Sequence, residues 1–285
     1  MDVGLGLTKV EGMWARLRSL ACGWAGCFRA RLPRSLRKAN GSSMRFKIVR
    51  LNLLVGVQLV EPYLLLPKRL PEVFEAFHKA LSPRHRMLLT DMQSVGGNSF
   101  GDLKLTINVF NGNGRIEITP SGLITDLRDL VRTDEDMKAI RDYLVTCEHA
   151  LIAAIRADEK TPVDLLQRDF RANLWIECEE GKEAAEAWLL DRGKEALQLR
   201  ADAYPEMRRE FTLQVHLVDE KGRGRIGLGI QRSQVEIGHL YVACEHQLHR
   251  KEEALGPMDA NFDRAYADLE GLLRAVGLEP ARDDV

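Results

Sequence analysis

The chain has 285 residues, of which 45% are apolar and 29% are charged, and its formal net charge is −1. This length is enough for one large or two small domains with ordinary hydrophobic cores. Residues 1–43 contain eight basic and two acidic side chains, so residues 44–285 carry a net charge of −7. An acidic body argues against general nucleic-acid binding, which relies on basic surfaces, and no apolar run approaches the roughly 18 residues that span a bilayer.

The N-terminal segment 1–43 differs in composition from everything after it. It is rich in arginine, and Trp14, Leu17 and Ala21 are among its apolar residues at helical spacing. We expect this segment to be a disordered or non-native extension, with Met44 as the natural first residue. The alternatives are an organellar targeting peptide and an amphipathic helix that binds a membrane surface or a partner.

The pattern of residues in the next part of the chain, up to about Ile155, predicts several strands and two helices. An apolar strand that includes Arg50 precedes a helix over 70–81, which has Pro71 in its first turn. Strands follow near 86–95 and over 103–109, and the second of these alternates apolar and polar residues. A turn with the pattern G-x-G-R-I at 112–116 leads into two more strands. A helix then begins at Thr133, where Asp136 completes a capping pattern, and runs to about Ile155.

The last part of the chain repeats this order of elements. A strand from Arg171 is followed by a helix over 182–192, for which Gly193 is a natural C-cap. Strands are expected near 195–203 and 211–217, and the second leads into another G-x-G-R-I turn at 222–226. A further strand and a helix from about Asp259 to Val276 complete the pattern.

These similarities predict an internal duplication of a β-α-β-β-β-β-α unit, an α+β fold with antiparallel sheets packed on C-terminal helices. The first unit covers residues 44–160 and the second covers 161–285, with a linker near 156–164. This element order resembles that of the TBP-like and helix-grip folds, in which an antiparallel sheet curves around a long C-terminal helix. Those folds include DNA binders, carriers of small molecules and enzymes, so the resemblance implies a topology and no particular function.

Gly222, Gly224 and Gly227 have the G-x-G-x-x-G spacing of a dinucleotide-binding loop. Such a loop must open a helix, because the pyrophosphate binds at the helix N-terminus. Here Ile226, Leu228 and Ile230 alternate with polar or small residues, as in a strand. The glycines therefore predict a hairpin turn, and no cofactor is expected.

The tripeptide Cys-Glu-His occurs at 147–149 and at 244–246. We expect Cys147 on the apolar stripe of a helix with His149 facing away, and Cys244 on the apolar face of a strand. Core cysteines are therefore expected, with no metal site, although His246 and His249 lie near Cys244. The five cysteines include no C-x-x-C pair, which indicates a reduced, cytoplasmic setting.

The second unit has an outward sheet face with one large aromatic residue, several hydrogen-bonding groups and a strip of glycines. Its candidate binding residues are Asn173, Trp175, Glu177, Gln214, His216 and Arg225. A polar face with an exposed aromatic is a plausible recognition surface. The alternative is that Trp175 covers the glycines or packs against the other unit.

No catalytic signature is present, so no catalytic residue is assigned and we lean against an enzyme. The first hypothesis is an interaction protein that binds a macromolecule, expected to be a protein, through this sheet face. The second is a binder of small molecules or lipids, which requires a cavity of a few hundred Å³ between sheet and helix. The third is an unrecognised enzyme, which requires His216 or His246 within hydrogen-bond reach of a carboxylate.

Overall fold

The computed structural model describes residues 43–83, 87–96, 102–130, 137–156, 163–196, 212–218, 224–236, 238–250 and 255–281. Within these ranges the protein is an α+β fold with one ten-stranded sheet and four α-helices. The strand order is β2-β3-β4-β5-β1-β6-β9-β8-β7, and β10 pairs with β1. The described strand pairs are antiparallel except for β1 with β10, which is parallel.

The first half of the chain contributes one side of the sheet and two helices. Its elements are β1 (Met44–Leu59), the 3-10 turn η1 (Leu66–Lys68), α3 (Leu70–Leu81), the 3-10 turn η2 (Leu89–Asp91), β2 (Met92–Val95), β3 (Lys104–Val109), the 3-10 turn η4 (Phe110–Gly112), β4 (Gly114–Thr119), β5 (Gly122–Leu127) and α4 (Met137–Arg156). The helix predicted over 70–81 is confirmed, with Pro71 in its first turn. The cap predicted at Thr133 and Asp136 lies outside the described residues.

The second half contributes the other side of the sheet. Its elements are β6 (Leu165–Cys178), α5 (Lys182–Ala196), β7 (Thr212–Val218), β8 (Gly224–Arg232), β9 (Leu240–His249), α6 (Met258–Ala275) and β10 (Leu278–Pro280). The predicted end of the helix at Gly193 is wrong, because α5 continues to Ala196. A glycine inside a helix costs only about 1 kcal/mol, which neighbouring turns can offset. The start of the strand predicted at 195–203 is therefore wrong, because residues 195 and 196 belong to α5. Residues 197–203 lie outside the described part.

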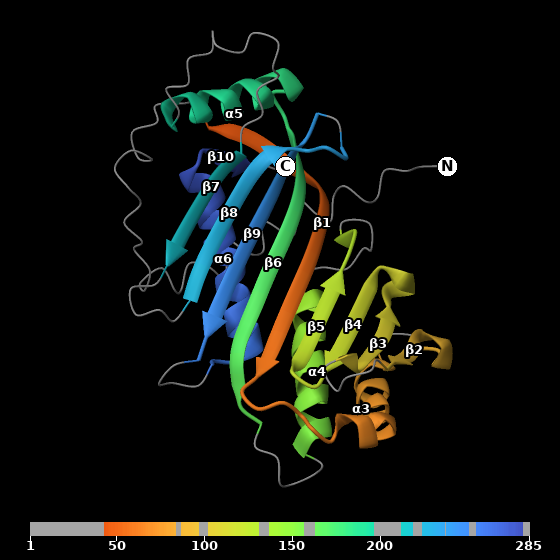
Figure 1. Cartoon of the computed structure of the whole chain (residues 1–285). Coiled ribbons are helices and arrows are strands. Elements are labelled where there is room, and N and C mark those ends of the chain that lie inside the picture. The colour runs from red at the N-terminus through yellow and green to blue at the C-terminus, as the bar shows by residue number, and fades with distance from the viewer. Residues whose placement is uncertain are drawn as a thin grey trace, which may run out of the picture.

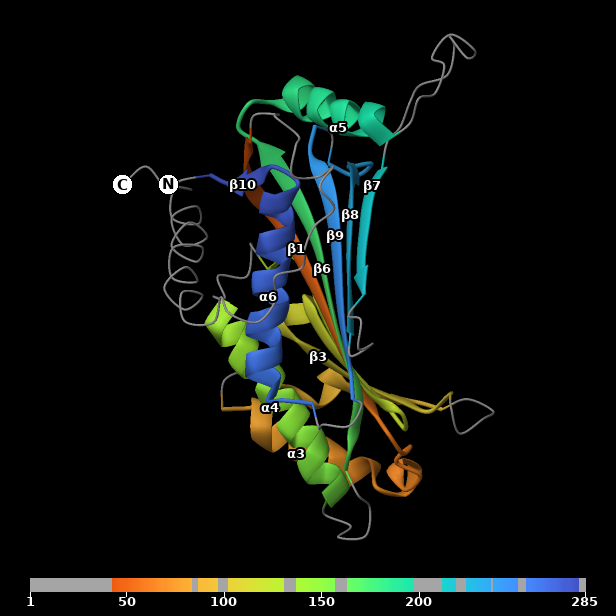
Figure 2. The same ribbon diagram turned by 90° about the vertical axis from the view of Figure 1, so that its left-hand side faces the viewer.

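The sheet separates a helix layer from an open side. Figure 2 shows α3, α4 and α6 together on one side of the sheet, while α5 crosses its upper end. The strands place alternate residues in the core beneath these helices, as in β1, where Leu51, Leu53 and Val55 are buried. The opposite side of the sheet is called the open face below, and none of α3, α4 and α6 covers it. No described helix is long and apolar enough to cross a bilayer.

The two halves are joined through their first strands. β1 and β6 pair along nearly their whole lengths, and Leu51 opposite Leu174 lies near the middle of the pairing. In Figure 1 these are the two long central strands, with β5 beside one and β9 beside the other. The two halves therefore form one continuous sheet, so that a surface on the open face can extend across both of them.

The glycine-rich stretch after β7 leads into a strand. β8 begins at Gly224 and pairs with β7 and β9 along its length, which confirms the predicted strand and excludes a helix-opening dinucleotide loop here. A Cβ atom at Gly224 would lie 2.5 Å from the carbonyl oxygen of Gln247, so only glycine allows this close approach of β8 to β9. Gly222 lies outside the described residues.

A buried ion pair connects the helix layer to β6. Arg168 donates from Nε and Nη2 to the two carboxylate oxygens of Glu148 on α4, at 2.8 and 2.7 Å. Its Nη1 donates to the carbonyl oxygen of Gly256, just before α6 begins. Because both side chains are at most 5% exposed, each charge depends on the other for compensation. One side chain thus holds β6, α4 and the start of α6 together.

We predict that removing either partner of this pair will destabilise the protein by about 3–5 kcal/mol, since the remaining charge would be buried alone. The variants are Arg168→Met and Glu148→Leu, and the measurement is the free energy of unfolding in urea. The double variant should recover much of the lost stability, because two apolar side chains need no charge compensation. Single variants with wild-type stability would contradict this account.

Candidate functional site

The open face is formed by the residues that alternate with the core residues of each strand. All six predicted binding residues lie on this face: Asn173, Trp175 and Glu177 on β6, Gln214 and His216 on β7, and Arg225 on β8. Four of them are exposed, whereas Asn173 is half-buried and Trp175 is buried. The strands thus bring the six residues to the same face, as the alternation predicted.

Trp175 lies at the centre of the sheet, between two cross-strand neighbours. It pairs with Arg50 on β1 and with Tyr241 on β9. The guanidinium carbon of Arg50 is 4.7 Å from the centre of the Trp175 ring, and the Tyr241 ring centre is 5.1 Å from it. Trp175 is therefore only 9% exposed. It packs against the first half of the chain, as the alternative reading of this residue proposed, and it offers little area for a ligand to stack on.

Hydrogen bonds and an ion pair fix the side chains around Trp175. The Arg50 Nε lies 2.7 Å from a carboxylate oxygen of Asp129, whose backbone N–H donates to Asn52 Oδ1 at 3.0 Å. The Tyr241 hydroxyl donates to Asn173 Oδ1 at 2.8 Å. These contacts make a preorganised polar border, because the groups are held in place before any partner arrives.

A strip without large side chains lies beside this border. It consists of Gly227, Gly229 and Ala243, which are neighbours on β8 and β9. Gln214 pairs with Gly229, and His216 pairs with Gly227, so two exposed polar side chains flank the strip on β7. At Gly229 a partner can approach the backbone closely, because a Cβ there would meet nothing closer than 3.9 Å, whereas at Gly227 a Cβ would lie 3.3 Å from the His216 imidazole. The flanking amide and imidazole can form hydrogen bonds with a partner.

Each half also carries one carboxylate between two cations on the open face. These groups are Lys104–Glu117–Arg115 in the first half and Arg171–Glu245–Arg225 in the second. Glu117 lies 2.5 Å from Lys104 and 2.9 Å from Arg115, and Glu245 lies 3.0 Å from Arg171 and 3.7 Å from Arg225. Each group of three carries a net charge of +1, although the body of the protein is acidic.

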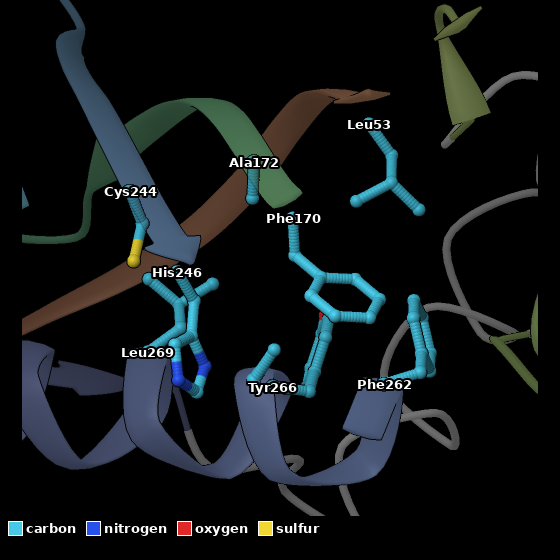
Figure 3. A pocket seen from close by; sticks show the side chains of 9 residues that line it. Leu53, Phe170, Ala172, Cys244, His246, Phe262, Tyr266 and Leu269 are labelled. Carbon is cyan, nitrogen blue, oxygen red and sulfur yellow. The ribbon is translucent and has the colours of Figure 1, made fainter. Parts of the chain in front are cut away.

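A small cavity lies on the other side of the sheet, beneath α6 (Figure 3). Its volume is about 20 Å³, and His246 and Cys244 line it together with apolar and aromatic side chains. The His246 Nδ1 is 3.6 Å from an Asp268 carboxylate oxygen, which is beyond ordinary hydrogen-bond reach. The cavity has room for about one water molecule. It is far below the few hundred Å³ that a lipid or small-molecule carrier requires at this place in the fold.

Burial also suppresses the reactivity of the groups that line this cavity. It raises the pKa of the Cys244 thiol to about 12, with Asp268 and Glu245 adding to the effect. It lowers the pKa of His246 to about 4, and the positive charge of Arg264 contributes. At neutral pH the thiol is protonated and the imidazole is neutral, so Cys244 is a poor nucleophile. The arrangement resembles a packed core more than a catalytic centre.

The first Cys-Glu-His tripeptide lies on α4, where Cys147 is buried and His149 is exposed, as predicted. The second lies on β9, where Cys244 faces α6. Sequence reasoning missed the role of Glu148, which lies between Cys147 and His149, and it missed Arg168 entirely. A signal was present, because Arg168 occupies a core-facing position of β6 two residues before Phe170, and a buried cation requires an acidic partner.

Neither a family model, a curated protein nor a solved structure matches this chain. The case for a function therefore depends on the open face and on the cavity.

We predict that His246 makes the stability of the protein decrease in acid. The folded state holds the pKa of this group near 4, below its ordinary value of 6.5, so the neutral form is favoured by folding. The contribution is fully present above pH 6.5 and is lost as the pH falls towards 4. Between pH 7 and pH 5 the wild type should lose about 2 kcal/mol more unfolding free energy than His246→Leu.

Urea unfolding at the two pH values measures this difference. Asp268 has a pKa raised mainly by burial, but it is present in both proteins, and the protonated Cys244 and Tyr266 do not titrate in this range. The positive charge of Arg264, which lowers the pKa of His246, is also present in both proteins. His149→Leu on the exposed side of α4 controls for the loss of a histidine elsewhere. An equal pH dependence in wild type and His246→Leu would refute the assignment.

Proposed function

We propose that this protein is a non-enzymatic, intracellular interaction protein that binds a protein partner through the open face of its sheet. The observation that carries the proposal is the strip of Gly227, Gly229 and Ala243 between a rigid aromatic border and exposed polar side chains. A sheet face with a bare strip admits an extended segment of a partner, whose backbone can approach closely.

The balance of charges supports a protein partner over a nucleic acid. The cations of the open face are largely engaged with carboxylates of the same face, as with Glu117 and Glu245. Binding to a polyphosphate backbone releases counterions from many free cations, and such a surface offers few of them. A partner with mixed polar and charged side chains fits this surface better. The buried free thiols of Cys147, Cys178 and Cys244 are compatible with a reduced compartment.

We further propose that the fold arose by internal duplication with a TBP-like arrangement of strands. In each half the first strand lies at the centre and pairs with the strand that precedes the C-terminal helix, as β5 pairs with β1 and β9 with β6. The segments from Arg50 and Arg171 support the proposal, because Asn52 and Asn173 are equivalent in them and pair directly. A two-fold relation would produce this pairing.

The two G-x-G-R-I turns do not share this register. In the sheet, Arg115 pairs with Asp126, which in turn pairs with Leu54 of β1. Arg225 pairs with Gln247, which in turn pairs with Asp169 of β6. A two-fold axis between Asn52 and Asn173 relates Leu54 to Trp175, which pairs with Tyr241, which pairs with Gln231. The position equivalent to Arg115 is therefore Gln231. Gln231 lies six residues after Arg225, whereas β8 has only three residues more than β4 (nine against six), so a longer β8 does not account for the offset. The two turns are not equivalent in this register, and the proposed duplication is supported by the first strands and the strand order.

We predict that Gly229→Lys will weaken binding of the partner at least tenfold, because the new side chain would fill the bare strip. A Cβ at Gly229 meets nothing closer than 3.9 Å, so the substitution does not strain the backbone. The matched control is Gly271→Lys, which adds the same side chain at an exposed position on α6, where a Cβ meets nothing within 4 Å.

The measurement is an affinity pull-down from the native host with quantitative mass spectrometry, followed by calorimetry with the purified partner. Wild type and Gly271→Lys should retain the same partner, and Gly229→Lys should lose it. A chain that begins at Met44 is compared in the same experiment, to show whether residues 1–43 contribute. Equal retention by both lysine variants would count against the open face as the binding surface.

A further inference from the structure

The strand β7 ends the sheet on the side of the second half. No strand among the described residues pairs with its outer edge. β7 has seven residues, its pairing with β8 has no bulge, and it contains no proline or charged residue. Natural proteins usually protect such an edge with charges, prolines, bulges or a very short strand, because exposed backbone groups can pair with another strand.

The other edge strand shows that protection. β2 has only four residues, so it offers a short edge. β7 is longer, and Val218 at its end is 70% exposed. Its side chains on the helix side, Leu213, Val215 and Leu217, are half-buried and pack on the edge of the core. The apolar side of β7 is therefore incompletely covered by the described residues.

We propose that β7 pairs antiparallel with β7 of a second copy of this chain, so that two sheets join into one. The sequence of the strand is complementary to its own reverse. Pairing centred on Val215 overlaps all seven residues and places Leu213 opposite Leu217 of the second copy. The apolar side chains of both copies then form one stripe on the helix side. Pairing centred anywhere else would shorten the overlap or would no longer place apolar side chains opposite apolar ones.

Charge favours a second copy as the occupant of this edge. Residues 212–218 contain no Asp, Glu, Lys or Arg, so the pairing of two β7 strands does not place like charges of these residues opposite each other. A strongly acidic or basic peptide would find no complementary charge on the strand. Self-pairing also places Gln214 opposite His216 of the second copy, and it joins the open faces of the two copies edge to edge.

The test uses the full chain and two double variants at exposed positions. In the proposed register Thr212 lies opposite Val218 of the second copy, and both side chains are exposed, so substitution there should preserve the fold. The first variant is Thr212→Lys/Val218→Lys, and the second is Thr212→Glu/Val218→Glu. Each variant opposes like charges at both ends of the pairing, while a mixture of the two opposes unlike charges. Light scattering after gel filtration gives the mass, and circular dichroism verifies folding.

The wild type should have twice the 32.2 kDa mass of the chain, and each double variant alone should have the monomer mass. An equimolar mixture of the two variants should recover the dimer. A monomeric wild type, a dimeric variant, or a mixture that stays monomeric would each overturn the proposal. Gly229→Lys alters β8 and leaves this edge intact, so it should remain dimeric, and failure of the open-face proposal is distinguishable from failure of this one.

Discussion

The pairing of β1 with β6 is the interaction on which the rest of the structure depends. It places two long strands side by side at the centre of one sheet, and each half adds its remaining strands outward from there, apart from the short β10, which pairs with β1. If the halves packed as separate lobes, each would have an exposed edge at its first strand. Because the two edges satisfy each other, the open face is continuous and the free edges move to β2 and β7.

The helix layer is attached to this centre by a polar contact as well as by apolar packing. Arg168 contacts Glu148 on α4 and the carbonyl oxygen of Gly256 before α6. Apolar packing alone permits the helices to slide by small steps at little cost, whereas a two-pronged hydrogen bond has one geometry. The ion pair therefore specifies how α4 and α6 lie relative to β6, which is a role attested for some buried polar groups in other proteins.

Much of the fold follows from patterns within single segments. Alternation gave the strands and their faces, Pro71 gave the start of α3, and Ile226, Leu228 and Ile230 distinguished a strand from a cofactor loop. Contacts between distant segments could not be predicted in this way. The neighbours of Trp175 depend on the register of β6 against β1 and β9, and nothing in a single segment specifies which residue lies opposite. The helix end at Gly193 failed because a local preference of about 1 kcal/mol can be overridden by neighbouring turns.

Two residues of β6 that break its alternating pattern also contact the first half of the chain. Arg168 is a charge at a core-facing position, and Trp175 is a large aromatic on the open face. Arg168 contacts Glu148 and Trp175 contacts Arg50, and both partners belong to the first half of the chain. Each also contacts its own half, because Arg168 donates to the carbonyl oxygen of Gly256 and Trp175 packs against Tyr241. Where a residue contradicts the binary pattern of its strand, a partner from a distant segment is thus the first explanation to test.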